Sequence, residues 1–464
     1  MIKRVFNIPF KYEYIYNLTY IAILIFFFFY YLEAATSYKY PLNDELGYLD
    51  EGIHLRNVSY DFREIYNRNR TPFLPLVISF LSLTAKNLNP FLYEQIYSTE
   101  YLNLFRSSQI AIIIITLFLT LLIVKELEKY FKSKLTILFF VFYLLYIPVT
   151  LHIKEVLVEP IFMLLYLYFI LILFQVKDSL ETKLYIKFGI VSGVFFLAKY
   201  TGFVIFIYSW LTLFIYRYLF KKEIKFSISI KQFAISMFLL CLIGSPYIIA
   251  NLSDGLNPFY SVNSKILWYN SWPEAYEIID KYDGNHGFKN IPSDLKPGLT
   301  YYLNNNSTSE ILERINLGLG NLRNDYTNPS DLAGKTSLIF SCLAFLITVN
   351  IFFTKREDKL NLLKKNLYQI FYIGSISLCL VVGYILYSPI SNSPRFHLYI
   401  SIPIIFLVTY FLDNLASLKT KNQNIRKLIN TFSIFLITYL YLIFINTYLF
   451  YGRVIGFIKS IFQL

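Results

Sequence analysis

Long apolar runs recur along almost the whole chain and are separated by short polar stretches. An α-helix rises about 1.5 Å per residue, so about 20 apolar residues cross the hydrocarbon core of a bilayer. Backbone groups in lipid must be satisfied within their own segment, which makes each run a predicted membrane-spanning helix. The spans expected are Tyr14–Leu32, Asn103–Val124, Leu135–Thr150, Glu155–Val176, Leu184–Ala198, Thr201–Phe220, Phe233–Ala250, Thr336–Thr354, Tyr368–Tyr387, Phe396–Leu412 and Leu428–Tyr451.

The basic residues between these runs predict the orientation of the chain. Cytoplasmic loops of membrane proteins carry an excess of Lys and Arg. Here the excess falls in every second loop, within 125–134, 177–187, 217–231, 355–365 and 419–427. We therefore expect a cytoplasmic amino terminus that continues into an uncleaved first span, and an integral multi-pass protein of the cell inner or plasma membrane.

The same topology places two long polar segments on the extracytoplasmic side and divides the chain into three parts. Residues 1–250 form a transmembrane core that includes the first extracytoplasmic loop, 34–102. Residues 251–335 form an extracytoplasmic loop or cap, and residues 336–464 form the C-terminal transmembrane helices. An apolar stretch inside the first loop, Pro72–Thr84, is short for a span and is expected to form an interfacial helix. The predicted fold is thus an all-α polytopic membrane protein of about eleven transmembrane helices.

Composition supports a membrane protein and argues against several other classes. The chain is 56% hydrophobic and only 16% charged, which is too apolar for a soluble protein of 464 residues. The formal charge of +13 is dispersed among the loops, so no basic domain for nucleic acid is expected. The three cysteines all fall in apolar runs without paired spacing, and no nucleotide-binding motif is visible.

The most informative polar motif is PLNDELGY, residues 41–48, which follows the first span on the outer side. Of two adjacent carboxylates such as Asp44 and Glu45, one can accept a proton from a hydroxyl nucleophile while the other binds a cation or substrate. The alternative interpretation is a solvated acidic turn.

The order of motifs along the chain resembles the GT-C membrane glycosyltransferases, particularly the protein O-mannosyltransferase and lipid A aminoarabinose transferase branch. The first span is followed by an outer DE-x-x-Y motif and, about 20 residues later, by basic residues, Pro72 and an apolar stretch. Further similarities are Glu159-Pro160, the segment GIVSGVFFLAKYTG (189–202), the segment GSPYIIANLSDGLNPFY (244–260), Ser393-Pro394-Arg395-Phe396 and Ile402-Pro403.

This resemblance implies roles for individual acidic residues. Asp44, the first acid of the pair, is implied to be the catalytic base, with Glu45 as the competing assignment. Glu159 is implied to be a second acid that lines the same cavity. Glu155 lies four residues earlier, so the two acids would share one face of a helix and point into the bundle, because ionised groups facing lipid are costly.

Transfer from a lipid phosphate also requires cations for the departing anion. Arg70, Lys199 and Arg395 each lie at an outer boundary of an apolar segment and are the candidates for donor-phosphate binding. The alternative for each is an interfacial side chain that reaches the lipid headgroups. The family's basic residue directly precedes a Pro, whereas Thr71 intervenes here.

Cofactor and sugar-binding candidates are less specific. All four histidines, His54, His152, His286 and His397, are predicted to lie near the outer surface, which makes a divalent metal possible, but their spacing fits no metal motif. The aromatic residues Trp268, Tyr269 and Trp272 could stack on a sugar or belong to the aromatic belt at the membrane surface.

We therefore expect an inverting glycosyltransferase that takes a sugar from a polyprenyl-phosphate donor and transfers it to a glycan, lipid or protein acceptor on the extracytoplasmic side. The alternatives are a polymerase-like protein of O-antigen or capsule synthesis and a transporter of lipid-linked oligosaccharide. A polymerase would depend on loop arginines rather than on the early acidic pair. A transporter should contain helix-breaking or charged residues at mid-membrane and two related halves.

Overall fold

The computed structural model describes residues 9–38, 40–41, 44–64, 70–85, 87–149, 152–221, 224–282, 291–292, 294–327, 356–390 and 398–417. Every regular element within these ranges is a helix. Six of the described helices are long and apolar enough to cross a membrane. They are α1 (Pro9–Ser37), α4 (Thr99–Leu127), α6 (Glu159–Val176), α8 (Thr201–Phe220), α9 (Phe226–Ile243) and α17 (Leu367–Tyr387). The protein is therefore an all-α, integral multi-pass membrane protein.

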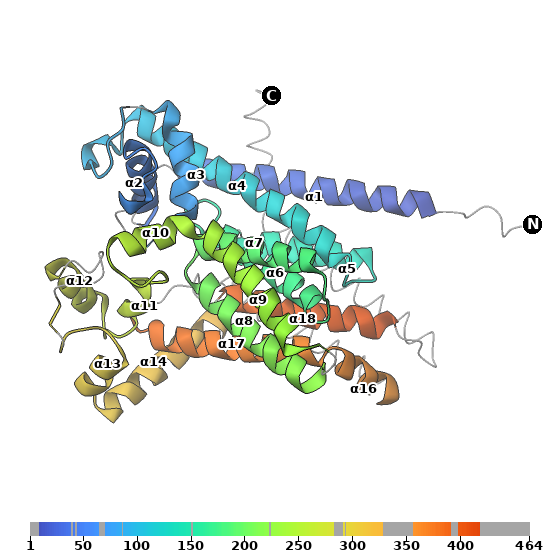
Figure 1. The fold of residues 1–464 in the computed structure, drawn as a ribbon. Helices are drawn as coiled ribbons and strands as arrows, with labels where there is room; N and C mark the ends of the chain where they lie inside the picture. The colour runs from blue at the N-terminus through green and yellow to red at the C-terminus, as the bar shows by residue number, and fades with distance from the viewer. Residues whose placement is uncertain are drawn as a thin grey trace, which may run out of the picture.

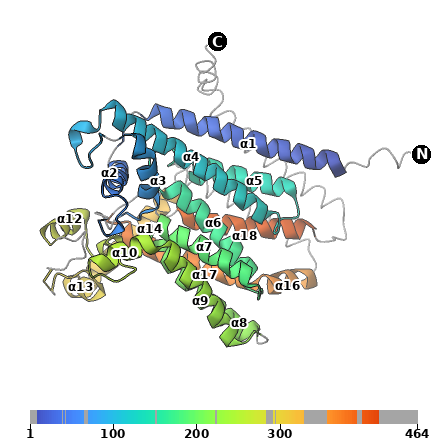
Figure 2. The same ribbon diagram turned by 45° about the horizontal axis from the view of Figure 1, so that its top comes forward.

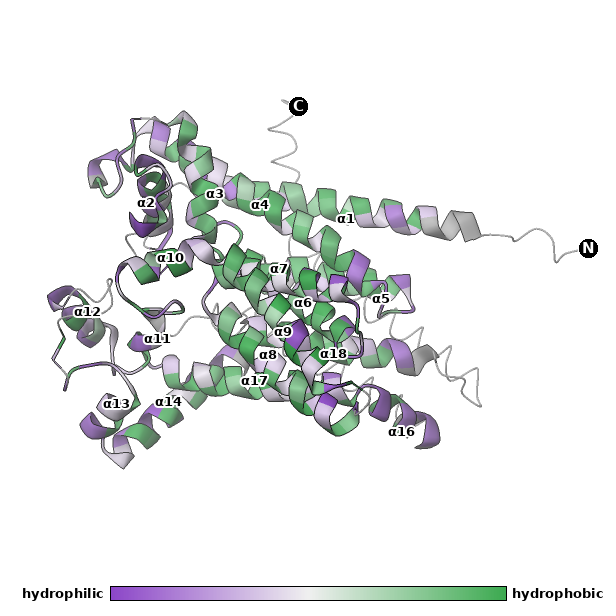
Figure 3. Cartoon of the chain, viewed as in Figure 1, coloured by the Kyte–Doolittle hydropathy of each residue, from purple (hydrophilic) through white to green (hydrophobic). Residues whose placement is uncertain are grey.

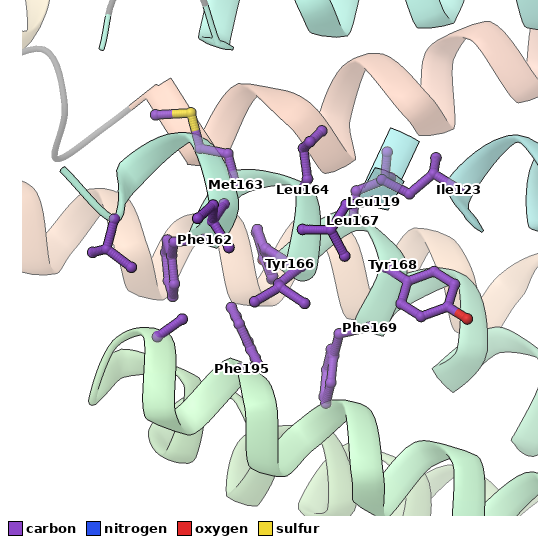
Figure 4. Close-up of a cluster of buried hydrophobic side chains, with 14 of the residues drawn as sticks. Leu119, Ile123, Phe162, Met163, Leu164, Tyr166, Leu167, Tyr168, Phe169 and Phe195 are labelled. Atoms are coloured by element: carbon purple, nitrogen blue, oxygen red, sulfur yellow. The ribbon is translucent and has the colours of Figure 1, made fainter. Parts of the chain in front are cut away.

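Helix α6 forms the centre of the bundle (Figure 1). The neighbouring helices are α4, α7 (Thr182–Ala198) and α18 (Leu398–Ser417), and almost every residue of α6 is buried. A helix that is apolar on all sides needs partners on all sides. Rings from α6 pack on α7, where Phe162 stacks on Phe195 with centroids 4.9 Å apart and Phe169 lies 5.4 Å from the same ring (Figure 4).

The start of α6 corrects one sequence prediction. The predicted span began at Glu155, but the helix begins at Glu159, and Glu155 lies in the preceding turn, where it contacts His152 Nδ1 at 3.1 Å. Pro160 accounts for the start, because proline is favoured in the first turn of a helix and not in its interior. Glu155 and Glu159 therefore do not share a helix face.

The predicted span Phe233–Ala250 is also interrupted. Helix α9 ends at Ile243, and after Gly244 the chain continues as a separate helix, α10 (Ser245–Ser253). A Cβ at Gly244 would lie 2.6 Å from the ring of Phe196, so the break occurs where the backbone approaches a buried aromatic side chain. The predicted spans Thr336–Thr354 and Leu428–Tyr451 lie outside the described residues, and the total of eleven spans stays a prediction.

The first long loop contains two helices that cross at close range. They are α2 (Asp44–Asn57) and α3 (Phe73–Leu81), and a Cβ at Gly52 of α2 would meet the Ile78 side chain of α3. Helix α3 has 9 residues, which is too short to cross a membrane. Figures 1 and 2 show α2 at the end of the bundle opposite the beginning of α1.

The second long loop is helical as well and lies at the same end as α2 (Figures 1 and 2). It contains α11 (Asn263–Ile266), α12 (Trp272–Lys281), α13 (Leu299–Asn305) and α14 (Thr308–Thr327). Arg314 of α14 donates hydrogen bonds to the carbonyls of Leu267, Tyr269 and Leu386, at 2.8, 2.9 and 2.9 Å. The bond to Leu386 fixes α14 to α17, and the other two bonds join α14 to the segment that follows α11.

Hydropathy follows the same division of the molecule. Apolar residues dominate the bundle, and hydrophilic residues gather on α2 and α12 at one end (Figure 3). The helix α16 (Arg356–Lys365), which belongs to a predicted cytoplasmic loop, is hydrophilic and lies at the opposite end. The two predicted outer segments thus lie together, away from this predicted inner loop.

Candidate active site

A cavity of about 600 Å³ lies where the first loop, the bundle and the second loop meet. Its wall includes residues of α2, the first residue of α6, the residues that follow α7, and residues of α8, α12 and α17. The lining residues are Asp44, Tyr48, Arg70, Thr71, Leu157, Glu159, Lys199, Tyr200, Thr201, Val204, Ser261, Ser264, Leu267, Trp272, Tyr276, Ile279, Asp280, Cys379, Leu380, Gly383, Tyr384, Tyr387 and Tyr399. Five candidates named from the sequence are therefore neighbours here, although they are distant along the chain: Asp44, Arg70, Glu159, Lys199 and Trp272.

Asp44 and Arg70 form the first charged pair of the cavity. Asp44 is the first residue of α2, and its Oδ1 lies 3.4 Å from Nη2 of Arg70. The Arg70 side chain is 16% exposed and that of Asp44 is 46% exposed. The guanidinium carbon is 5.4 Å from the centroid of the Tyr48 ring, within the range of a cation–π contact. Arg70 is held between an acid and an aromatic face, while Asp44 remains accessible.

Glu159 and Lys199 form the second charged pair. Glu159 is the first residue of α6, and Lys199 follows the last residue of α7 in an extended conformation. Lys199 Nζ lies 3.4 Å from Glu159 Oε1 and 5.4 Å from the centroid of Phe162. The Glu159 side chain is only 7% exposed. A buried carboxylate needs such a partner, because an isolated charge in a dry environment is costly.

Thr71 links the two pairs. Its hydroxyl donates a 2.7 Å hydrogen bond to the carbonyl of Ala198, so the residue after Arg70 is tied to the residue before Lys199. In the sequence, Thr71 was notable only because it separates Arg70 from Pro72, unlike the family motif. In the structure this buried hydroxyl brings the two basic residues to one wall.

Glu45 does not line the cavity. Glu45 is only 2% exposed, and its Oε1 accepts a 2.8 Å hydrogen bond from the backbone amide of Val156. Burial together with the negative charge of Glu45 raises the pKa of Tyr38 to about 12. The geometry therefore gives Glu45 a structural function, the attachment of α2 to the segment before α6, and offers no support for the competing assignment of Glu45 as the base.

Asp50 is a further acid of α2 that the sequence did not single out. Tyr101 of α4 donates a 3.1 Å hydrogen bond to its Oδ1. Burial raises the pKa of Asp50, although the hydrogen bonds and the charge of Arg70 oppose this shift. Asp50 does not line the cavity, and its contact with Tyr101 anchors α2 to α4.

The second loop supplies an aromatic and acidic face to the cavity. Trp272 and Tyr276 of α12 stack with ring centroids 5.2 Å apart, and Asp280 follows at the same spacing of four residues. Of the other aromatic candidates, Trp268 packs near Tyr302, and Tyr269 is fully buried. Tyr276 and Asp280 were missed in the sequence, although spacing by four after Trp272 would have placed them on one face of a helix.

The remaining candidates do not gather into a metal centre among the residues described. His54 Nε2 contacts the carbonyl of Glu64 at 2.8 Å, and His152 pairs with Glu155. No group of three or more His, Cys, Asp or Glu side chains suited to a metal ion occurs in the described part of the chain. His286, His397 and the phosphate-binding candidate Arg395 lie outside the described residues.

Comparisons with known proteins give a distant structural likeness. No family model and no curated protein matches the chain. Among solved structures, the chain is similar to the crystal structure of ArnT from Cupriavidus metallidurans bound to undecaprenyl phosphate, with 11% sequence identity and a TM-score of 0.37. The match covers 86% of this chain and 77% of that one. At this TM-score the likeness is too distant to carry an argument about the site.

Proposed function

We propose that the protein is a glycosyltransferase that moves a sugar from a polyprenyl-phosphate donor to an acceptor on the extracytoplasmic side of the membrane. The observation that carries this proposal is the convergence of Asp44, Arg70, Glu159 and Lys199 on one cavity beside the membrane bundle. Such a transfer requires a proton acceptor and an anion-binding site. The two acidic side chains can supply the proton acceptor, and the two basic side chains can supply the anion-binding site.

The two basic residues are suited to the donor phosphate. Arg70 offers a planar guanidinium with several donors, and Lys199 offers an ammonium from the neighbouring wall. A phosphate between them would be neutralised in the ground state and stabilised further as the bond to the sugar breaks, because the charge on the leaving oxygen then grows.

The accessible carboxylate of Asp44 is suited to general-base catalysis. In the proposed step, Asp44 accepts the proton of an acceptor hydroxyl, and the acceptor oxygen forms a bond to the anomeric carbon. The bond from that carbon to the phosphate oxygen breaks, and polyprenyl phosphate leaves as the anion. Attack opposite the leaving group inverts the anomeric configuration. Glu159 keeps Lys199 oriented toward the cavity through their 3.4 Å contact.

Part of the cavity wall consists of exposed residues of two helices long and apolar enough to cross a membrane. Val204 of α8 and Cys379 of α17 line the cavity, and both are exposed. Gly383 lies one helical turn after Cys379 and leaves open space, since a Cβ there would meet no described atom within 4 Å. An isoprenoid chain in the bilayer can reach the charged end of the cavity by this route.

A transfer assay tests the proposal directly. Purified protein in nanodiscs is incubated with undecaprenyl-phosphate-linked hexoses and pentoses and with a cell-envelope extract as the source of acceptor. We expect protein-dependent release of undecaprenyl phosphate, measured by mass spectrometry, together with incorporation of the sugar into the acceptor fraction. Movement of the intact lipid-linked sugar across the membrane, without release of undecaprenyl phosphate, would support a transporter instead.

The orientation of the site forms a separate prediction. Asn305, at the end of α13, is exposed, and Glu181, in a predicted cytoplasmic loop, is exposed as well. In intact cells a membrane-impermeant maleimide should label Asn305→Cys and should label Glu181→Cys only after the cells are opened. The reverse pattern would place the cavity on the cytoplasmic side. Variants that lack the three native cysteines serve as the background.

A further inference from the structure

Gly47 lies in α2, three residues after Asp44, directly beneath the guanidinium of Arg70. A Cβ built at Gly47 would lie within 2.5 Å of Nη1 and closer still to Cζ and Nη2. The three nearest atoms thus all belong to the head of Arg70. No side chain other than the hydrogen of glycine leaves room for the guanidinium in this position.

We propose that Gly47 is a positioning residue that sets the phosphate-binding geometry of Arg70. This inference rests on the proposed function. The missing side chain makes a slot on the surface of α2, with Oδ1 of Asp44 at 3.4 Å from Nη2 and the Tyr48 ring centroid at 5.4 Å from Cζ. Among the described residues, Nε of Arg70 has no hydrogen-bond partner, so the shape of the slot helps to hold the side chain.

A second glycine of the same helix provides a contrast. A Cβ at Gly52 would meet Ile78 of α3 and would lie 3.1 Å from the carbonyl oxygen of Pro75. Gly52 therefore serves the packing of two helices, and its replacement should disturb the fold. Gly47 instead faces the mobile end of one charged side chain, and its replacement should move that end while the helix stays intact.

The test compares binding of undecaprenyl phosphate by the full-length protein and its variants in nanodiscs. Gly47→Ala should weaken this binding roughly ten- to hundredfold, the range for losing a hydrogen bond to a charged group. Its unfolding temperature should stay the same or rise, because alanine favours helix more than glycine does. Gly374→Ala is the matched control, since a Cβ at Gly374 of α17 meets no described atom within 4 Å.

A double-mutant cycle separates positioning from a general structural effect. In the Arg70→Ala background, Gly47→Ala should have no further effect on binding, because the group it displaces is absent. If Gly47→Ala lowers the affinity for undecaprenyl phosphate equally with and without Arg70, the inference is overturned. It is also overturned if Gly47→Ala binds with wild-type affinity while Arg70→Ala binds weakly. If Arg70→Ala itself binds undecaprenyl phosphate as tightly as the wild type, the proposed phosphate site fails, and the inference fails with it.

Discussion

Asp44→Asn is expected to lower the rate of sugar transfer about 10²- to 10⁴-fold, the usual cost of losing a general base. Asparagine has the shape of aspartate but cannot accept the proton of the acceptor hydroxyl. Asp44 is at the surface of the cavity and lies 3.4 Å from Arg70, so the substitution removes little packing. The protein should therefore still insert, fold and bind undecaprenyl phosphate.

Glu45→Gln is the matched control for this substitution, because it changes the neighbouring acid in the same chemical way. Glu45 is buried, does not line the cavity and accepts a hydrogen bond from Val156, which the amide oxygen of glutamine can also accept. The turnover of folded Glu45→Gln protein should therefore stay close to that of the wild type. The measurement is the release of undecaprenyl phosphate per folded molecule. Near-normal turnover in Asp44→Asn, or a larger loss in Glu45→Gln, would contradict the assignment of Asp44 as the base.

Lys199→Ala is expected to slow transfer by roughly 10²- to 10³-fold. This is the usual cost of removing one preorganised group that stabilises a developing anion. The ammonium of Lys199 lines the cavity on the wall next to Arg70 and would meet the departing phosphate. Lys154→Ala is the matched control, because Lys154 lies over the Tyr38 ring, outside the cavity, and should leave the rate unchanged.

A structural explanation of the Lys199→Ala effect can be tested separately. Removing Lys199 takes the described basic partner from the buried Glu159, which by itself can destabilise the protein. The double variant Lys199→Ala/Glu159→Gln removes that unbalanced charge. Its unfolding temperature should recover while its transfer rate stays low. Recovery of the rate in the double variant would show that Lys199 only neutralises Glu159.

The predictable part of the fold was the part that rests on length and hydrophobicity. Thr201–Phe220 was predicted with the bounds observed for α8, and the span predicted at Tyr368 begins at Leu367 in the structure. Both are apolar runs with sharp polar or turn boundaries. The later start of α6 and the break at Gly244 depend on Pro160 and on the contact of Gly244 with Phe196. Hydropathy averaged over a span does not detect such contacts.

The charged residues of the candidate site were predictable, because acidic and basic side chains have evident uses as proton acceptors and anion-binding groups. Asp44 and Glu159 were identified from the motif resemblance, and Arg70 and Lys199 from their positions at the outer boundaries of apolar segments. The structure brings these four residues together. Their catalytic and phosphate-binding roles stay predictions.

Other features needed tertiary contacts that the sequence does not contain. The sequence favoured Asp44 as the base and left Glu45 as the competing assignment. Only the fold shows that Asp44 lines the cavity and that Glu45 is bonded to the backbone of Val156. The contact of Gly47 with Arg70 likewise joins residues on different elements.

The most direct test of the proposed site is a cryo-electron-microscopy structure of the protein in nanodiscs with undecaprenyl phosphate. We expect the phosphate in the cavity, with oxygens about 2.7–3.2 Å from the guanidinium of Arg70 and the ammonium of Lys199. The isoprenoid chain should leave between α8 and α17, past Val204 and Cys379. A phosphate bound elsewhere, for example beside Lys129 and Lys187 near Glu126, with the cavity empty, would contradict the proposed site.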